Sequence, residues 1–403
     1  MREALFRASI NPMESQSIPV EEFSDRRARA AAAAQAHGLD GLVICSRGGG
    51  TLDRYGDVQY LTNYVTSFPF IPDLPGQWAG RAHAFVVLRA DGAARLIADA
   101  PDDATAAIDA QDIRPAEDVL ACVAEALREL GLAHGRLGLV GSDVLSVAHE
   151  RALRGHVPGA HWQEAQEILV NLRAIKSPAE LDQLRHASAI GSRTLEAMMQ
   201  VAEPGVSHGE VVAAGMGVLA PAGGALYNSF MASGRGGVEA YAHRRNFPTW
   251  GTSAPLAEGE WFRIGISGAV GGYVFDHSRS KAIGAPSNRQ IALFEDAMAI
   301  VEAAIAAIRP GVQAQDIAAA GLAEQAARGY PNDGVFSGLG HGIGLGWDAP
   351  WLAPGDTTLL EPGMVLSVER TIRKDGYLGD YEDSVIVTDT GTERISHAQK
   401  RWW

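Results

Sequence analysis

Hydrophobic and polar positions alternate along the chain with the period of a helix in some segments and with the period of a strand in others, and these periods predict its helices and strands. Residues 21–39 have the spacing of a helix that stops near Gly38, and residues 116–130 have the spacing of a second helix. Short apolar runs typical of strands cover residues 40–46, 82–88, 94–100 and 135–141. This alternation of helices and strands indicates an α/β layer structure for residues 1–172.

The rest of the chain, residues 173–403, has a different pattern. Ser177, Pro178 and Glu180 predict the start of a long helix with a capping box. Ala-rich helical segments follow at 289–308 and 314–329, and glycine-punctuated strands, several in antiparallel-looking pairs, surround them. We therefore expect a second domain of the α+β class.

One long segment between the first two predicted strands, residues 55–80, shows neither period. It is rich in aromatic residues and prolines and contains the stretch "YVTSFPFIPDLPGQW" at 64–78. Long irregular segments within a compact domain are more often functional than accidental. We therefore expect this segment to be a functional loop.

Composition excludes several classes of protein. With 403 residues, of which 46% are hydrophobic, the chain is long enough for two cores. We find no apolar run of the roughly 18–20 residues that a membrane span needs, and the charged N-terminus lacks the apolar core of a signal peptide. A net charge of −14 argues against a nucleic-acid partner. We expect a cytoplasmic protein with Cys45 and Cys122 as free thiols.

Acidic residues and histidines recur in strand-like, glycine-flanked segments of the second half. They are His243 in "EAYAHRRN", Asp276 in "GGYVFDHSRS", His341 in "GLGHGIGLGWDAP", Glu369 in "GMVLSVER" and Glu382 in "DYEDSVIVT". Each one alone is also explained by a cap, a turn, packing or an exposed surface. Strand residues with apolar flanks, however, point inward or into a cleft, so the set predicts a site.

In this order, and together with "DVQYLTNY" and "LRAIKSPAELDQLR", these motifs resemble the pita-bread superfamily of aminopeptidases, prolidases and creatinases. The resemblance covers nearly the whole chain. It implies a creatinase/prolidase-like N-terminal domain at 1–172, a pita-bread catalytic domain at 173–403 and a homodimer. If one subunit reaches over the other's active site, as in creatinase-like members, the loop 64–78 is a candidate lid with Tyr64, Phe68 and Trp78 as substrate walls.

The resemblance also implies ligands for two metal ions, namely two Asp, one His and two Glu. Four of these five positions fall on Asp276, His341, Glu369 and Glu382, but the first Asp falls on Gly265. His243 matches a histidine that lies over the scissile bond. Asp348 stands where the peptidases carry a histidine that contacts the substrate. Trp347, Trp351 and Phe336 are candidate walls, and core packing explains them equally well.

Without the first aspartate, the carboxylates need another counter-charge, because buried unpaired charges are costly. One hypothesis is a creatinase-like hydrolase, without metal, that cleaves a C–N bond of a small cationic amidine, guanidine or ectoine-type metabolite. Here His243 is the acid/base, Asp276, Glu369 and Glu382 are catalytic or bind the cation, and His341 and Asp348 bind substrate.

Three alternatives remain open. A peptidase of the Xaa-Pro aminopeptidase or prolidase kind would hold one Mn, Fe, Co or Zn ion on Asp276, His341, Glu369 and Glu382. A lyase similar to the dimethylsulfoniopropionate lyases would use a carboxylate as base. The last alternative is a binding protein without activity. Asp348 favours the cationic substrate.

Overall fold

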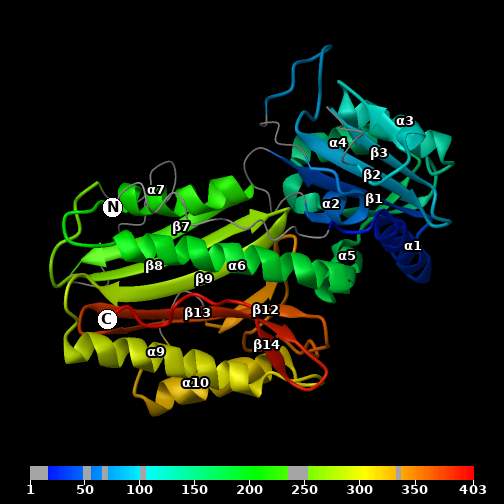
Figure 1. The fold of residues 1–403 in the computed structure, drawn as a ribbon. Coiled ribbons are helices and arrows are strands. Elements are labelled where there is room, and N and C mark those ends of the chain that lie inside the picture. The colour runs from blue at the N-terminus through cyan, green and yellow to red at the C-terminus, as the bar shows by residue number, and fades with distance from the viewer. Residues whose placement is uncertain (1–16, 49–55, 66–70, 100–105, 235–252, 333–336) are drawn as a thin grey trace. The chain divides into compact units, whose positions relative to one another are not determined.

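The computed structural model describes residues 17–48, 56–65, 71–99, 106–234, 253–332 and 337–403. The chain divides into two compact units, Ile18–Arg173 and Ala174–Trp403, and each is built around its own sheet (Figure 1). The α/β class expected for the first unit and the α+β class expected for the second are both confirmed.

The N-terminal unit has a six-stranded mixed sheet with the order β4-β3-β2-β1-β5-β6. Its strands are β1 (Gly41–Arg47), β2 (His83–Arg89), β3 (Ala94–Ala98), β4 (Ile113–Pro115), β5 (Arg136–Val140) and β6 (His161–Glu164). Its helices are α1 (Val20–Ala36), α2 (Gly56–Thr62), α3 (Val119–Glu129), α4 (Val147–His156) and α5 (Gln166–Ala174), with 3-10 turns at Ala110–Asp112 and Ser142–Val144. The four strands and two helices predicted from the periodicity are all present.

Helix α2 differs from the expectation of irregular structure across 55–80. Its C-terminal carbonyls have partners on helix α1: Arg26 donates to the carbonyl of Tyr60 at 3.1 Å, and Arg27 donates to the carbonyl of Leu61 at 2.7 Å. Cationic side chains at a helix C-terminus satisfy carbonyls that the helix itself leaves without a donor. The helix therefore depends on contacts that are distant in sequence.

The C-terminal unit has an eight-stranded sheet with the order β11-β10-β12-β13-β9-β8-β7, and β14 pairs with β13. Its strands are β7 (Ala225–Gly234), β8 (Trp261–Val270), β9 (Tyr273–Ala282), β10 (Gly340–Ile343), β11 (Trp347–Trp351), β12 (Val365–Lys374), β13 (Tyr377–Val387) and β14 (Thr392–Arg394). Its helices are α6 (Pro178–Val201), α7 (His208–Leu219), α9 (Asn288–Ala307) and α10 (Ala314–Ala327), with a 3-10 turn at Ala220–Ala222.

Helices cover the C-terminal sheet in two groups. Helices α6 and α7 pack on β7, β8 and β9, whereas α9 packs on β12 and β13 with α10 against it (Figure 1). Helix α6 begins at Pro178 with the predicted capping box of Ser177 and Glu180. It lies close to the sheet at Gly191, where an added Cβ would be 2.5 Å from the ring of Phe275. This close contact fixes strand β9 against helix α6 at Phe275, the residue immediately before Asp276.

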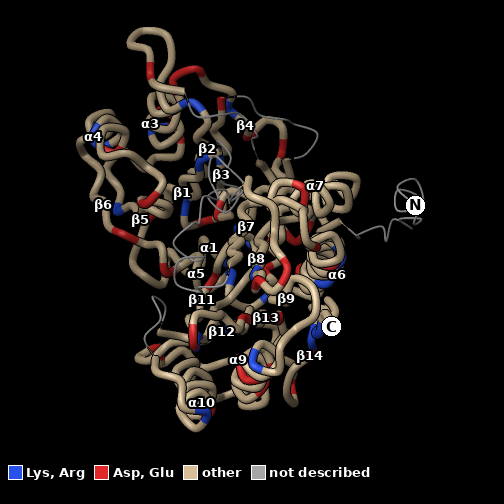
Figure 2. The backbone as a smooth tube through the Cα atoms, turned by 90° about the vertical axis from the view of Figure 1, so that its left-hand side faces the viewer, with Lys and Arg blue, Asp and Glu red and all other residues tan. Residues whose placement is uncertain are grey.

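The distribution of charged residues, the two cysteines and the hydropathy of the helices can be compared with the expectations from composition. Figure 2 shows basic and acidic positions interspersed in both units. Cys45 and Cys122 are free thiols. Within the described ranges we find no helix that combines the length and the apolar character needed to cross a bilayer.

Candidate active site

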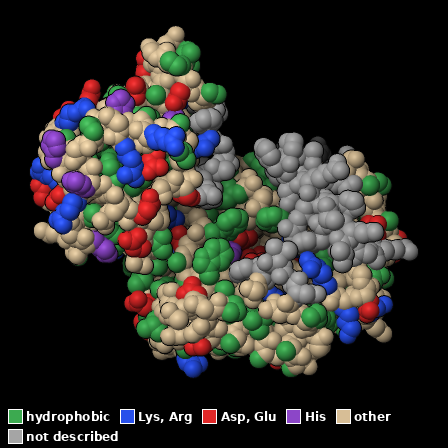
Figure 3. All heavy atoms as spheres, turned by 180° about the vertical axis from the view of Figure 1, so that it is seen from behind, with side chains coloured by type: hydrophobic (Ala, Val, Ile, Leu, Met, Phe, Trp, Pro, Cys, Tyr) green, Lys and Arg blue, Asp and Glu red, His purple; other side chains and the backbone are tan. Residues whose placement is uncertain are grey.

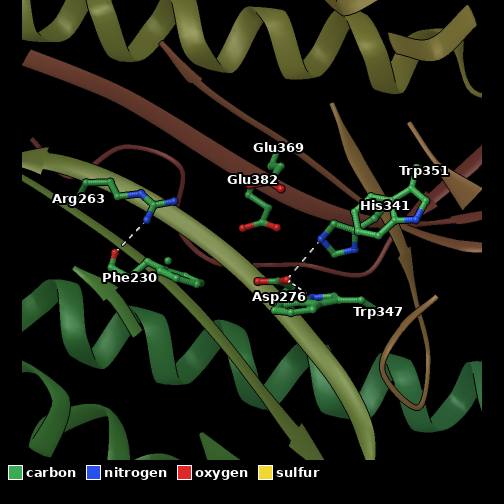
Figure 4. Close-up of a pocket in the computed structure, with 9 residues that line it drawn as sticks. Phe230, Arg263, Asp276, His341, Trp347, Trp351, Glu369 and Glu382 are labelled. Atoms are coloured by element: carbon green, nitrogen blue, oxygen red, sulfur yellow. Dashed lines mark hydrogen bonds and ion pairs between the residues drawn. The ribbon is translucent and has the colours of Figure 1, made fainter. Parts of the chain in front are cut away.

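A pocket of about 260 Å³ lies within the C-terminal unit. Figure 4 shows its lining side chains, which come from seven strands of the same sheet. The residues that line it are Phe230, Arg263, Gly265, Asp276, His341, Trp347, Trp351, Glu369 and Glu382. Figure 3 shows a hollow where acidic side chains and a histidine lie beside hydrophobic ones, the composition of this lining. The structure therefore brings the four predicted ligand positions together with Gly265.

Asp276 is held in place by the β8–β9 hairpin. The turn is Gly271–Gly272, where both φ angles are positive, at 60° and 87°, a conformation that favours glycine. This turn sets Ser267 opposite Asp276 in the register, and the Ser267 hydroxyl lies 3.1 Å from Oδ1 of Asp276. The indole N–H of Trp347 donates to Oδ2 at 2.9 Å. Both carboxylate oxygens are thus oriented before any ligand binds.

Glu369 and Glu382 are a cross-strand pair on β12 and β13. Residues directly opposite in an antiparallel ladder present their side chains on one face, so the register places both glutamates in the pocket. The hydroxyl of Ser367 donates to Oε1 of Glu382 at 2.8 Å. Glu382 is buried, whereas Glu369 is half-buried.

His341 lies on β10 between two indole rings. Its ring centroid is 5.8 Å from that of Trp347 and 5.6 Å from that of Trp351. The ring Nδ1 is 3.0 Å from the carbonyl of Gly342, and its other nitrogen, Nε2, is 3.7 Å from Oδ2 of Asp276. A backbone carbonyl accepts only from an N–H, so this contact places the proton on Nδ1 and directs Nε2 toward the carboxylates.

Arg263 is buried in the pocket wall on β8 and was not among the site residues expected from the sequence. Its Nε donates to Oδ2 of Asp380 at 2.8 Å, and its Nη1 donates to the carbonyl of Phe230 at 3.0 Å (Figure 4). A Cβ at Gly265 would lie 3.2 Å from Nη2 of Arg263. The signal was present in "WFRIGIS", because alternate residues of a strand share a face and Arg263 is two positions from Gly265.

The three carboxyl groups that line the pocket have shifted pKa values. Burial raises the pKa of Asp276, although the neighbouring His341 and the Trp347 N–H lower it in part. Burial, together with Asp276, raises the pKa of Glu369, and His341 opposes that shift. Burial and the negative charges of Asp276 and Glu369 raise the pKa of Glu382 well above its usual range. A cation in the pocket would lower all three.

Arg263 keeps its charge in this environment. Burial alone would lower the pKa of its guanidinium, but Asp380, Glu369 and Glu382 raise it above the ordinary value. The pocket therefore contains a fixed positive charge beside the acidic cluster.

The donor atoms fit one metal ion rather than two. Asp276, His341 and Glu382 each offer one ligand atom, and these atoms lie within 4.8 Å of one another. Two carboxylates and an imidazole suit Mn, Fe, Co or Zn. Gly265 contributes no donor for a second ion, and the guanidinium of Arg263 lies beside that position.

Other candidate residues have different environments. Asp348 is not among the residues found to line the pocket, and its Oδ2 is 3.2 Å from Nζ of the buried Lys176. This contact places a counter-charge for Asp348 within the protein. The contact of Asp348 with a cationic substrate stays a prediction. His243, Phe68 and Phe336 lie outside the described residues.

The two aromatic residues of the expected lid that the structure describes belong to the N-terminal unit. Tyr64 is only 1% exposed, and Trp78 is half-buried with its N–H donating to the carbonyl of Pro72 at 3.0 Å. Their contact with substrate stays a prediction. Trp347 and Trp351 do line the pocket, and both are about half exposed, at 46% and 47%.

Two family models and several known proteins match this chain. The model of metallopeptidase family M24 matches residues 182–389, and that of the creatinase/prolidase N-terminal domain matches residues 26–175. The chain is similar to an Xaa-Pro dipeptidase of Lactobacillus helveticus, with 30% identity over 64% of this chain and 70% of the relative. It is also similar to the ectoine hydrolase of Halomonas elongata, with 26% identity over 64% of this chain and 68% of the relative.

The fold also matches a solved structure. The Xaa-Pro dipeptidase from Bacillus anthracis superposes with a TM-score of 0.75 and 24% identity, over 94% of this chain and 99% of that chain. The protein belongs to metallopeptidase family M24, and its architecture is the pita-bread fold preceded by a creatinase/prolidase N-terminal domain. It is a hydrolase of that family.

Proposed function

We propose that this protein hydrolyses a C–N bond in a small, positively charged nitrogenous metabolite, such as an amidine, a guanidine or an ectoine-type ring. The observation that carries the proposal is the charge balance of the pocket. Asp276, Glu369 and Glu382 converge there, whereas the cation that lines it, Arg263, is already paired with Asp380. A cationic substrate supplies the missing positive charge.

The pocket residues have distinct roles in this proposal. Glu369 and Glu382 bind the substrate cation by charge-assisted hydrogen bonds, and Ser367 orients Glu382. Asp276, held by Ser267 and Trp347, orients the attacking water. The water loses a proton as its oxygen forms the new bond to carbon, the C–N bond breaks, and the leaving nitrogen takes up that proton. We propose His243 as the group that transfers this proton.

The size and lining of the pocket support a small substrate. The pocket volume of about 260 Å³ lies just below the range typical of pockets that bind drug-sized ligands. The half-exposed rings of Trp347 and Trp351 offer faces that attract a cation. The similarity to an ectoine hydrolase, a relative whose name describes a non-peptide substrate, also supports the proposal.

A second candidate is a peptidase of the Xaa-Pro dipeptidase kind that uses one metal ion. The similarity to the Lactobacillus dipeptidase favours it, as does the cluster of Asp276, His341 and Glu382. A divalent ion held by these residues would supply Lewis-acid polarisation of the scissile carbonyl. Arg263 would then stabilise negative charge near the reacting carbonyl, and Glu369 would accept a proton from water.

Turnover of a substrate panel separates the two candidates. Protein purified without added metal, and the same protein after chelation, is incubated with ectoine, creatine and Ala-Pro, and the products are identified by mass spectrometry. We expect cleavage of an amidine or guanidine that survives chelation. Cleavage of Ala-Pro that requires one equivalent of a divalent ion would instead establish the peptidase, and an unsaturated product without added water would indicate a lyase.

A matched pair of variants ties any activity to the pocket. Glu382→Gln removes a charge that the proposal needs, so we expect a loss of activity of more than 100-fold. Glu361→Gln makes the same change at an exposed position and should leave activity intact. The homodimer implied by the family resemblance is a further proposal, which the mass of the protein in solution tests.

A further inference from the structure

We infer that Arg263, held by Asp380, is a built-in cation of the pocket wall that limits how much further positive charge the acidic cluster accepts. The pocket then accepts at most one divalent ion, at Asp276, His341 and Glu382. This inference concerns the number of cations and does not depend on which substrate is cleaved.

Arg263 is fixed in position. Its side chain is 6% exposed, and its guanidinium is bonded to Asp380 on strand β13 and to the carbonyl of Phe230 on strand β7. Asp380 is itself held, because the hydroxyl of Thr371 donates to its other carboxylate oxygen. The guanidinium thus spans three strands and cannot leave the pocket wall without breaking a buried ion pair.

Gly265 makes room for the guanidinium of Arg263. Phe230 and Gly265 are opposite in the β7–β8 register, and Arg263 is on the same face of β8. A Cβ at Gly265 would lie 3.2 Å from Nη2 and 3.4 Å from both Cζ and Nη1 of Arg263. A side chain at this position would therefore lie in tight contact with the guanidinium. The absence of a side chain at Gly265 therefore leaves the space in which the guanidinium of Arg263 lies.

Arg263 also affects the acidic cluster through its charge. Arg263 is near enough to Glu369 and Glu382 for both glutamates to favour its charged form. A positive charge fixed beside a cation site repels a second cation, and the repulsion is strong because the pocket wall is buried. Arg263 consequently lowers the affinity of the neighbouring cluster for a divalent ion.

Binding of Mn²⁺ tests this inference without measuring activity. Isothermal titration calorimetry and elemental analysis give the number of ions bound and their affinity. Because removal of Arg263 alone would leave Asp380 buried without its partner, the test variant combines Arg263→Met with Asp380→Asn. We expect at most one Mn²⁺ in the wild-type protein and at least tenfold tighter binding in the double variant. Arg263→Lys retains the charge and should bind Mn²⁺ within threefold of wild type.

A second variant keeps the inference testable if the double variant fails to fold. Gly265→Asp places a carboxylate against Arg263, and we expect the two to form an ion pair, so that the number of bound Mn²⁺ ions stays at one or below. Two bound ions in the wild-type protein or in Gly265→Asp would overturn the inference. So would an unchanged Mn²⁺ affinity, or the absence of measurable binding, in a folded double variant.

Discussion

Arg263 and Asp380 form an ion pair that is buried on both sides, with 2.8 Å between Nε and Oδ2 and side-chain exposures of 6% and 1%. The pair joins strand β8 to strand β13, and Asp380 also accepts from Thr371. A buried ion pair contributes little net stability compared with apolar residues of the same size, but the loss of one partner is costly. Each of the two charges therefore depends on the other for its burial.

Removal of one partner should reveal that cost. We expect Asp380→Asn to lower the free energy of unfolding by about 3 kcal/mol, because it leaves the guanidinium of Arg263 without its carboxylate. Urea unfolding monitored by circular dichroism measures the change. The double variant Arg263→Met with Asp380→Asn should lose less than the sum of the two single variants. Strict additivity would show that the two residues do not stabilise each other.

Ser367→Ala should weaken cation binding without unfolding the protein. The hydroxyl of Ser367 donates to Glu382 at 2.8 Å and favours its ionised form, so its loss raises the pKa of that carboxyl further. We expect a five- to tenfold loss of Mn²⁺ affinity at pH 7 by calorimetry. Ser142→Ala removes a bond of the same length to Glu164 in the N-terminal unit and is the matched control. Equal Mn²⁺ affinities in the two variants would contradict this role of Ser367.

Most of the fold could be predicted from the sequence because local signals and burial pointed the same way. The capping box of Ser177 and Glu180 is a short-range signal, and helix α6 begins where it indicates. The hairpin that carries Asp276 was similarly readable from its glycine turn and apolar flanks. Helix α2 was missed because its carbonyls are satisfied by Arg26 and Arg27, contacts that no local pattern records.

The ion pairs around the site were less predictable from the sequence than the residues that could bind a cation. The motifs placed Asp276, Glu369 and Glu382 in one pocket, but the partners of neighbouring charges depend on pairing between distant strands. Arg263 meets Asp380 across 117 positions, and Lys176 meets Asp348 across 172. A sequence reveals which residues carry charge, and only the fold reveals which charges are already balanced.

Asp348 tests whether a charge that is paired within the protein still contributes to cation binding. Because its carboxylate pairs with Lys176, with side-chain exposures of 6% and 1%, we expect Asp348→Asn to lower the free energy of unfolding by about 3 kcal/mol. Its Mn²⁺ affinity should stay within threefold of wild type, since Asp348 is not among the residues found to line the pocket. Lys176→Met should have a similar effect on stability. A variant of Asp348 with unchanged stability and a tenfold loss of cation affinity would instead support its assignment to the binding site.

His208 should make the stability of the C-terminal unit depend on pH. Its ring is buried at the start of α7, with Nε2 2.9 Å from the hydroxyl of Ser233 and the ring 5.6 Å from that of Phe262. Burial lowers the pKa of His208 from 6.5 to about 4, so the unfolded chain binds a proton more readily than the folded one between these values. The stabilisation is therefore complete above pH 6.5, is lost as the pH falls toward 4, and amounts to about 3 kcal/mol at most.

The variant His208→Gln keeps a hydrogen-bonding group for Ser233 but does not titrate, so it isolates this contribution. We expect the free energy of unfolding of the wild-type protein to fall more than that of the variant between pH 7.5 and pH 4.5. The comparison is made by urea unfolding at both pH values, and contributions from other titrating groups cancel in the difference. His161→Gln changes an exposed histidine and should reproduce the wild-type profile. Parallel profiles for the wild type and His208→Gln would mean that His208 is protonated equally in the folded and unfolded states.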